Sequence, residues 1–334
     1  MVLNYNGRRY LDRCMEALLA QDLEGGLEVL LVDNASTDGS AEYVRARFPE
    51  VHLIESANNL GFAGGNNLGM RHARGRYVVL LNNDTRVRPG WLAALVETAS
   101  AEPDIGAVTS KVVFMKQPNM IQNAGVLLLS DGSGADRGAG EEDSGQYDRQ
   151  EEVFGACGCA MLLKREMLEQ IGGFDIAFFM YYEDTDLSWR MRLWGWRIVY
   201  QPSAVVEHVH SGTSVEWSPF FTFHVDRNRL FMILKNAPPG FVLRSFGWYG
   251  WLAAQGAARA LFRRGRRPSG GATWPTKASI SPVSRARIHL HVLASLMRYL
   301  PEMLAKRRRI RRGRRVSEAE IMRWLYARRR WDAR

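Results

Sequence analysis

Cysteine is scarce in this chain of 334 residues, which contains Cys14, Cys157 and Cys159 and no others. Three scattered cysteines cannot form the disulfide framework of a small secreted domain. Cys157-x-Cys159 also has no second pair or nearby histidine at the spacing of a zinc site. We therefore expect reduced thiols in the core or in loops, and a reducing, cytoplasmic compartment.

Long apolar runs are missing as well. No uninterrupted apolar run reaches the roughly 18 residues of a membrane span. The nearest is residues 241–262, where Arg244, Gln255 and Arg259 favour a helix lying in a membrane interface. The N-terminus has no signal-peptide pattern, and its first apolar run of three or four residues predicts a short or clipped first strand.

Two common nucleotide-binding signatures do not occur. The first apolar run leads into NYNGRRYL rather than G-x-G-x-x-G, and GFAGG follows a later run with the wrong glycine spacing. Hydride transfer with a dinucleotide is therefore disfavoured. No G-x-x-x-x-G-K-[ST] occurs, which excludes the P-loop NTPases.

The residues that are present can fill a large core, since 46% are hydrophobic and 10% are aromatic. Apolar, β-branched runs recur about every 25 residues with helix-like segments between them, at residues 27–34, 51–56, 77–82 and 105–114. This rhythm predicts βαβ units and an α/β fold with a mainly parallel sheet covered by helices.

Changes in composition predict the organisation of the chain. Residues 130–152 are acidic, Gly-rich and without periodicity, and we interpret them as a mobile loop. Near residue 238 the sequence APPG interrupts the chain, and the residues that follow are helical in pattern and rich in Trp, Leu and Arg. We thus predict a domain over residues 1–238 and a basic helical extension over residues 239–334.

The net charge of +10 belongs to the C-terminal region. Residues 259–334 contain 22 Lys or Arg and four Asp or Glu, so the rest of the chain is acidic. Clustered cations beside amphipathic segments favour peripheral binding to the anionic inner face of the cytoplasmic membrane. The alternatives are a solvated helical face and nucleic-acid binding; the acidic body and the lack of a base-reading module argue against nucleic acid.

Polar segments follow three of the apolar runs: VDNASTDGS, SANNLGFAGGNN and NNDT. Asn, Asp and Gly dominate ordinary turns, which would explain any one of these segments alone. In open parallel sheets, however, ligands bind at the carboxyl ends of the strands. Three polar strand ends in succession therefore favour a shared ligand crevice.

Two later segments carry groups capable of chemistry. In FFMYYEDTDLSW, Glu183, Asp184 and Asp186 follow an aromatic run. Carboxylates at the start of a helix can simply cap it. Apolar rings that exclude water can also raise the pKa of a carboxylate towards the range of a general base. In VVEHVHSGTS, His208 and His210 end an apolar run, either as structural residues or as metal ligands.

Together these segments resemble the family 2 glycosyltransferases with the GT-A fold, particularly the bacterial rhamnosyltransferase-like branch. The resemblance covers roughly residues 1–236 and rests on NYNG, VDNASTDGS, NNLGFAGGNNLGMRHARGRYVVLLNNDTRVRPGW, GACGCAMLLKREMLEQIGGFDIAFFMYYEDTDLSWRMRLWGWRIVYQP and HVHSGTS. It implies an inverting transferase that moves a sugar from a nucleotide to a hydroxyl of a glycan or lipid-linked glycan in the assembly of cell-surface polysaccharide.

The resemblance also implies roles for individual residues. Asp184 matches the general base, and Glu183 matches a residue that orients or binds the acceptor. Asp84 matches the last carboxylate of the family's D-x-D motif and His208 a histidine that completes a site for Mg²⁺ or Mn²⁺, with His210 as the alternative. Binding of the nucleotide sugar is implied for Leu3, Tyr5, Asp33, Gly64, Asn66, Asn67, Asn82, Asn83 and Asp84.

Asn82 departs from the family, because the motif often has aspartate at that position. The branch favours dTDP-L-rhamnose as the donor, and UDP-linked hexoses or other nucleotide sugars are the alternative, since VLNYN does not separate thymine from uracil. A non-catalytic glycan- or nucleic-acid-binding protein is the alternative of another class. The sequence does not indicate the oligomeric state.

Overall fold

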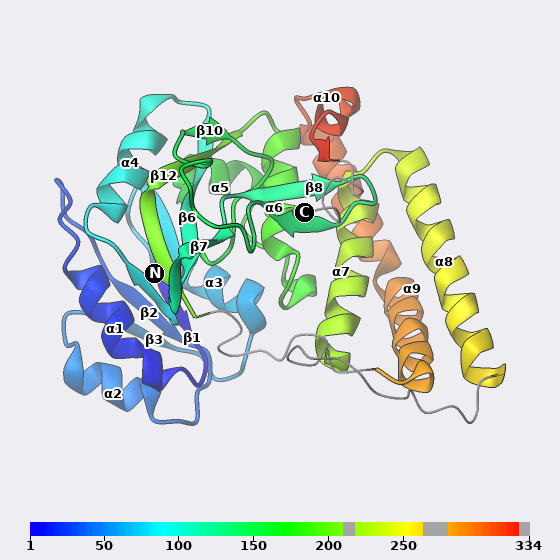
Figure 1. The fold of residues 1–334 in the computed structure, drawn as a ribbon, viewed down its shortest axis with the longest axis horizontal. Helices are drawn as coiled ribbons and strands as arrows, with labels where there is room; N and C mark the ends of the chain where they lie inside the picture. Colours follow the sequence, from blue (N-terminus) through cyan, green and yellow to red (C-terminus); the bar gives the residue numbers. More distant parts are fainter. Residues whose placement is uncertain (210–217, 263–279, 327–334) are drawn as a thin grey trace. The chain divides into compact units, whose positions relative to one another are not determined.

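The structure is a computed structural model that describes residues 1–209, 218–262 and 280–326 (Figure 1). The chain forms two compact units, the first made of Met1–Thr213 and Arg314–Arg334 and the second of Ser214–Gly313. This division falls before the helix over residues 219–236, whereas the boundary predicted from composition falls near residue 238. The domain boundary at residue 238 stays a prediction. His210 and the basic run 263–267 lie outside the described residues.

A ten-stranded sheet forms the centre of the first unit. Eight strands follow in the order β10-β12-β6-β11-β4-β1-β2-β3, with β5 beside β12 and β7 beside β6. The strands are β1 (Val2–Asn4), β2 (Leu30–Asp33), β3 (His52–Glu55), β4 (Tyr77–Asn82), β5 (Thr85–Val87), β6 (Ile105–Phe114), β7 (Gln117–Asn123), β10 (Glu151–Glu152), β11 (Ala160–Lys164) and β12 (Arg197–His208).

The strands β4, β1, β2 and β3 are parallel neighbours, so their carboxyl ends lie along one edge of the sheet. β11 runs antiparallel between β4 and β6, and β12 runs parallel to β6. The four apolar runs predicted as strands are confirmed as β2, β3, β4 and β6.

Helices cover both faces of this sheet, as predicted (Figure 1). One core contains side chains of α1 (Arg8–Leu19), α2 (Ser40–Arg47) and α4 (Trp91–Ala101), and the other contains side chains of α3 (Gly61–His72), α5 (Arg165–Ile171) and α6 (Glu183–Leu193). Within β2, Leu31 enters the first core while Leu30 enters the second, because successive side chains of a strand point to opposite faces. Each such buried leucine contributes about 1.5–3 kcal/mol to folding.

The acidic segment 130–152 contains more structure than the sequence predicted. β8 (Val126–Leu129) pairs with β9 (Gly134–Asp136), and β13 (Leu325–Tyr326) joins β8 to make a separate three-stranded sheet. The buried Lys111 also binds Asp143 at 2.8 Å and Asp148 at 2.6 Å. The segment has regular structure because β8 offers it a pairing edge; its expected mobility stays a prediction.

The second unit contains α7 (Pro219–Asn236), α8 (Pro239–Phe262) and α9 (Pro282–Gly313), which confirms the predicted helical C-terminal region. α9 packs against both α7 and α8. α10 (Glu318–Met322) and β13 then return to the first unit. In the part of the chain that the structure describes, none of the helices combines the length and the apolarity needed to cross a bilayer.

Candidate active site

Hydrogen bonds join the carboxyl ends of β1, β2 and β4. The fully buried Asn4 donates from Nδ2 to Asp33 Oδ2 at 3.1 Å and accepts at Oδ1 from Asn83 Nδ2 at 2.7 Å. Asn34 Nδ2 donates to Asn59 Oδ1, beyond the end of β3, at 3.0 Å. The three polar segments predicted to share a crevice therefore meet at one edge of the sheet.

Gly7 makes this close packing feasible. A Cβ at Gly7 would lie 1.9 Å from Asn83 Nδ2 and 2.6 Å from Asn4 Oδ1, so a side chain there would displace both amides. The glycine of NYNG is thus required for a close approach between the start of α1 and the polar edge.

Leu3, Tyr5 and Asp33 lie around this edge, where the resemblance puts the nucleobase. Tyr5 is 43% exposed just beyond β1, so its ring is accessible for packing on a planar base. Asp33 is buried and accepts from Ser36 N at 2.9 Å as well as from Asn4. Since each carboxylate oxygen has two lone pairs, Asp33 can still accept from a ligand N–H.

The residues predicted to reach the ribose and diphosphate lie in α3, where neighbouring groups engage their side chains. Asn66 Nδ2 donates to Phe62 O at 3.0 Å. The Asn67 amide pairs with the backbone of Phe174 in both directions, at 2.8 and 2.9 Å. A Cβ on Gly64 would lie 2.8 Å from the Leu60 Cβ. These contacts give the three residues packing roles, and their contacts to a donor stay predictions.

Strand pairing brings Asp84 and His208 together from distant parts of the sequence. β5 pairs antiparallel with the end of β12, so that Thr85 lies opposite His208, and Val209 N donates to Asp84 O at 3.0 Å. Asp84 Oδ1 then lies 3.1 Å from His208 Nε2, and the side chains are 6% and 11% exposed. The sequence predicted both residues for one site, and the structure brings them into contact.

Glu207 supports the register that makes this contact. Its buried carboxylate accepts from Arg86 Nε at 2.8 Å and lies 3.3 Å from Arg88 Nε, and both arginines lie on the β5 side of the pair. A slip of one residue would separate these charges and move His208 to the other face of the sheet.

The Asp84–His208 pair fits a divalent cation. Donors at about 2.1 Å around an octahedral Mg²⁺ lie about 3 Å from one another, close to the observed 3.1 Å. Among residues 1–209, 218–262 and 280–326, no three His, Cys, Asp or Glu side chains cluster closely enough to hold an ion. A cation here would therefore need other ligands, such as water and diphosphate oxygens, as is common for Mg²⁺.

Asp184 lies in the first turn of α6, where three donors hold its carboxylate. Gly158 N donates to Oδ2 at 3.0 Å, and Thr185 donates to Oδ1 from its N at 2.6 Å and from its Oγ1 at 3.1 Å. Burial raises the pKa of Asp184 above its ordinary value, although these three donors lower it. A raised pKa suits a carboxylate that must accept a proton.

Glu183 is buried beside Asp184, and its Oε2 has no hydrogen-bond partner among the described residues. Burial, and after it the neighbouring charge of Asp184, raise the pKa of Glu183 well above its ordinary value. Asp186 instead forms an ion pair with Arg190 at 2.9 Å, and Arg190 also donates to Gly173 O at 2.7 Å. This pair fixes the start of α6.

The aromatic run before α6 has an unusual backbone. Phe179, Tyr181 and Tyr182 have φ angles of 65°, 67° and 69°, a region that such residues seldom adopt. Gly61, with φ 69°, packs against Phe179, where a Cβ would lie 2.4 Å from the carbonyl oxygen. The strained run is thus fixed against the N-terminus of α3 immediately before the acidic residues, and such strain is concentrated at functional sites.

The short loop that contains Gly158 and Cys159 lies between Asp184 and the Asp84–His208 pair and is hydrogen-bonded on both sides. Gly158 N donates to Asp184, and Cys159 O accepts from Asn82 N at 2.9 Å, two residues before Asp84. Gly158 gave no chemical signal in the sequence, because a glycine between two cysteines is only a turn former by type. Asn4 and Thr185 were likewise missed.

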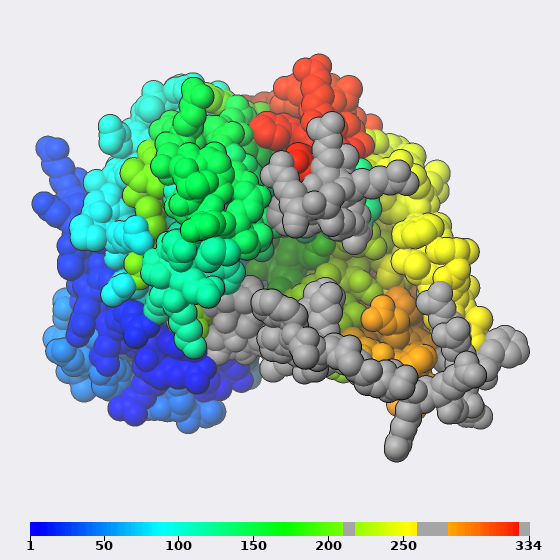
Figure 2. All heavy atoms as spheres, viewed as in Figure 1, coloured from blue at the N-terminus to red at the C-terminus, as the bar shows by residue number. Residues whose placement is uncertain are grey.

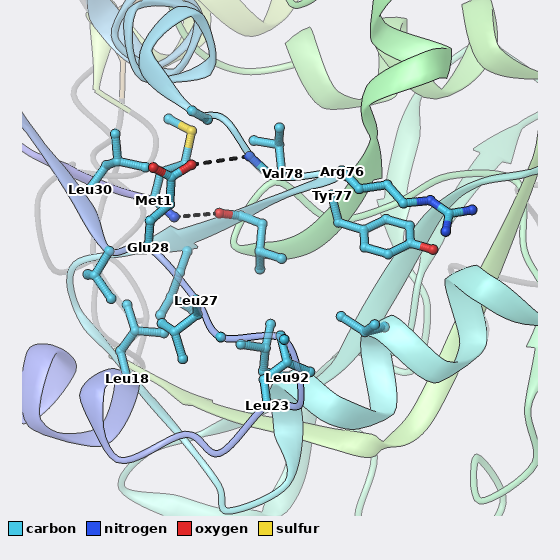
Figure 3. Close-up of a pocket in the computed structure, with 18 of the residues that line it drawn as sticks. Met1, Leu18, Leu23, Leu27, Glu28, Leu30, Arg76, Tyr77, Val78 and Leu92 are labelled. Atoms are coloured by element: carbon cyan, nitrogen blue, oxygen red, sulfur yellow. Dashed lines mark hydrogen bonds between the residues drawn. The ribbon is translucent and has the colours of Figure 1, made fainter.

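A separate cavity of about 330 Å³ lies at the amino ends of β1, β2 and β4 (Figure 3). Its wall is mainly apolar and includes Met1, Leu18, Leu23, Leu27 and Leu92. Because it lies at the opposite end of these strands from the polar edge, it is not part of the candidate site.

Comparison with known proteins decides the family. The sequence model of the family described as Glycosyl transferase family 2 matches residues 1–172, just over half of the chain. The chain belongs to glycosyl transferase family 2. The predicted family is thus confirmed.

This family 2 glycosyltransferase is 29% identical over 292 residues to the N-acetylglucosaminyl-diphospho-decaprenol L-rhamnosyltransferase of Mycobacterium tuberculosis, a match that covers 80% of this chain and 94% of that protein. It is 28% identical over 208 residues to the O-antigen biosynthesis protein RfbC of Myxococcus xanthus, covering 60% of this chain and 16% of that protein. The resemblance to the rhamnosyltransferase-like branch is confirmed.

Solved structures confirm the predicted GT-A fold. The mannosyltransferase PcManGT from Pyrobaculum calidifontis, in complex with GDP-Man and Mn²⁺, has a TM-score of 0.52 at 21% identity and covers 90% of this chain and 85% of its own. GalNAc-T7 with UDP, GalNAc and Mn²⁺ has a TM-score of 0.59 at 14% identity and covers 86% of this chain and 52% of its own. At these identities the likeness concerns the fold alone.

Proposed function

We propose that this enzyme is a metal-dependent, inverting transferase that moves L-rhamnose from dTDP-L-rhamnose to a hydroxyl of a glycan or lipid-linked glycan. The observation that carries the proposal is the Asp84–His208 pair at the carboxyl edge of the sheet, together with Asp184. The loop of Gly158 and Cys159 is hydrogen-bonded both to Asp184 and to the backbone just before Asp84. These are the parts that an inverting displacement from a nucleoside diphosphate requires, a cation site and a general base.

In this mechanism Asp184 takes the proton of the acceptor hydroxyl while its oxygen attacks the anomeric carbon from the face opposite the diphosphate. The new C–O bond forms as the bond to the diphosphate breaks, and the electron pair of that bond leaves with the nucleoside diphosphate. Asp84 and His208 would hold Mg²⁺ or Mn²⁺, whose positive charge would stabilise the departing diphosphate. No covalent glycosyl-enzyme forms, so one carboxylate base suffices.

Other side chains bind the two substrates. Asp33 accepts from the N3–H of the pyrimidine, while Leu3 and Tyr5 line the base pocket. Glu183 orients or binds the acceptor. The remaining donor contacts are assigned to Gly64, Asn66, Asn67, Asn82 and Asn83. Asn82 would contact the ribose or a water of the cation, and because it carries no charge it would not add to the attraction for the cation.

The choice of rhamnose is supported by the M. tuberculosis relative, whose name specifies an L-rhamnosyl group and the lipid-linked acceptor N-acetylglucosaminyl-diphospho-decaprenol. The second candidate donor is a UDP-hexose or another nucleotide sugar, since structural neighbours are named with GDP-Man and with UDP and GalNAc. The proposed role in cell-envelope polysaccharide assembly is supported by the likeness to the O-antigen biosynthesis protein RfbC.

A thermal-shift panel of dTDP-L-rhamnose, UDP-hexoses and GDP-mannose, each with Mn²⁺, tests the donor. The preferred donor stabilises the folded state by mass action, so dTDP-L-rhamnose should give the largest rise in melting temperature. A larger rise with a UDP-hexose would replace the rhamnose assignment. The anomeric configuration of the product, measured by NMR, tests inversion.

The second unit is proposed to bind an anionic membrane surface. α9 has a buried apolar stripe and a second, exposed one whose members are 36–72% exposed: Leu290, Leu293, Met297, Leu300 and Leu304. On α8, which lies at the surface (yellow in Figure 2), Trp248 and Trp251 stack with ring centroids 4.7 Å apart and are 54% and 49% exposed. Stacked tryptophans and leucines at the surface suit the interfacial region of a bilayer.

Charge complementarity supports an anionic bilayer as the partner. The exposed stripe of α9 is accompanied by Arg285, Arg287 and Arg298, and α8 contains Arg244 near its start. Each such cation contributes about 1 kcal/mol near an anionic leaflet. A peripheral position on the inner face of the cytoplasmic membrane would bring the enzyme to a lipid-linked acceptor.

A further inference from the structure

Both ring nitrogens of His208 are in use. Nε2 lies 3.1 Å from Asp84 Oδ1, and Nδ1 lies 3.0 Å from the side-chain oxygen Oε1 of Gln122. Since Oε1 is an amide oxygen and can only accept, the hydrogen of this bond belongs to His208 Nδ1. A neutral imidazole has a single N–H, so Nε2 then presents a lone pair towards Asp84.

This arrangement places two acceptors against each other. In the neutral ring the Nε2 lone pair and the Asp84 carboxylate face each other at 3.1 Å, so a positive charge between them, either a proton on Nε2 or a divalent cation, stabilises the pair. The two atoms are separated as the adjacent ligands of a small divalent cation are. Gln122 contacts the ring at Nδ1, the nitrogen that does not face Asp84.

The backbone explains why Gln122 points this way. In the pairing of β6 with β7, Val112 lies opposite Asn123 and Val113 opposite Ile121, which leaves Gln122 as an extra residue in a β-bulge. A bulge changes the direction of a side chain and is often found beside active sites. The Asn123 side chain accepts from Gly125 N at 2.7 Å and donates to Asp136 at 2.6 Å, which fixes the bulge.

We propose that Gln122 is a positioning residue, which holds His208 as the Nδ1–H tautomer so that Nε2 and Asp84 together present two donors to a divalent cation. The inference rests on the proposed function in that Asp84 and His208 are taken as the cation ligands. Hydrogen-bond partners of ligating histidines commonly act in this way, and their loss lowers metal affinity about 10–100-fold.

The test compares Gln122→Met, which keeps the length of the side chain but loses the acceptor, with Gln122→Glu, which keeps an acceptor oxygen. Binding of Mn²⁺ alone to the full chain is measured by the electron paramagnetic resonance signal of the free ion. We expect Gln122→Met to bind Mn²⁺ at least tenfold more weakly, and Gln122→Glu to retain binding. Gln117→Met, the same change at an exposed position of β7, should have no effect.

The tautomer itself is read from ¹⁵N–¹H correlation spectra of the imidazole rings, with His208→Gln used to assign the signal. The expected result is a protonated Nδ1 in the unaltered protein and in Gln122→Glu, and a loss of that preference in Gln122→Met. A ring protonated at Nε2 and not at Nδ1 in the unaltered protein, or undiminished Mn²⁺ binding by a folded Gln122→Met, would overturn the proposal.

Failure of the proposed function gives a different result. If Asp84→Asn and His208→Gln both leave Mn²⁺ affinity unchanged, the cation site is wrong, and the proposed role of Gln122 in cation binding is overturned with it. If those two variants lose Mn²⁺ while Gln122→Met does not, the cation site stands and only the positioning role is overturned.

Discussion

Asp184 accepts three hydrogen bonds and still has a raised pKa, because burial outweighs the donors from Gly158 and Thr185. Both properties matter for a base. The donors fix the direction of the carboxylate, and the raised pKa increases its affinity for the proton of an acceptor hydroxyl.

Replacing Asp184 with asparagine should lower kcat by roughly 10³-fold, since a positioned general base contributes about 10²–10⁴-fold. The dissociation constant for dTDP with Mn²⁺ should change little, because the base faces the acceptor rather than the nucleotide. Steady-state transfer assays and calorimetry measure the two quantities. Near-normal turnover by Asp184→Asn would remove the base assignment.

The pH profile tests the environment of the same carboxylate. As the proposed base, Asp184 must be ionised, so activity should fall as the pH drops through its pKa. The Thr185 Oγ1 donor lowers this pKa, so its removal in Thr185→Val should raise the pKa and move the acid limb to higher pH. Thr185→Ser keeps the hydroxyl and should leave the profile in place. The pH dependence of kcat/KM gives the answer, and a shift to lower pH would contradict the assignment.

Single side chains differ in how far the sequence predicts them. Asp84 and Asp184 could be named as candidates from the sequence, because a carboxylate after an apolar run or before a helix carries its chemistry in its residue type. Gly158 and Asn4 act through contacts made only in the fold, so their types gave no indication. Asn67 shows the reverse case, in which the residue type suggested a role that the fold does not display. The resemblance implied a contact with the donor, but the side-chain amide of Asn67 is hydrogen-bonded to the backbone of Phe174.

At the level of elements, the proposed cation site depends on the pairing of β5 with β12. β5 has only three residues, and the buried Glu207 links it to β12 through Arg86 and Arg88. The longer strands had the apolar periodicity of a parallel sheet and could be predicted from it. Strands of two or three residues, such as β9, β10 and β13, are too short to show a period and form only where a partner edge is available.

Glu207→Gln should lower the free energy of unfolding by about 1–2 kcal/mol. Breaking a buried ion pair costs about 3–5 kcal/mol, but Arg86 and Arg88 are 52% and 45% exposed and can be hydrated, which reduces the loss. Urea unfolding measures it. Glu16→Gln, which breaks an ion pair with Arg47 between side chains each 57% exposed, should cost less than about 0.5 kcal/mol. Equal losses would mean that Glu207 does not support the register.

At the scale of the whole molecule, membrane binding needs a test that keeps the chain intact. Deleting residues 241–334 would also remove β13, which pairs with β8 in the first unit. Substitutions on the surface of the second unit avoid this problem, because the exposed tryptophans of α8 contribute little to its core.

The double variant Trp248→Ser/Trp251→Ser should co-sediment at least tenfold less with vesicles that contain phosphatidylglycerol, since it loses the apolar area that would enter the interface. Leu27→Ser, at a 37% exposed leucine of the first unit, should bind as well as the unaltered protein. Binding of unaltered protein to vesicles of phosphatidylcholine alone should be weaker. Equal binding of the double variant would exclude α8 as the membrane contact.

The pairing of β13 with β8 also has a consequence for biosynthesis. Leu325 lies beside Leu128, so roughly 200 residues, including the whole second unit, are translated between the two strands. At a translation rate of about 5–20 residues per second, β13 is synthesised roughly 10 to 40 seconds after the hairpin of β8 and β9. A nascent chain arrested before residue 325 can therefore fold its large sheet, but it leaves one edge of β8 open to other chains until translation ends.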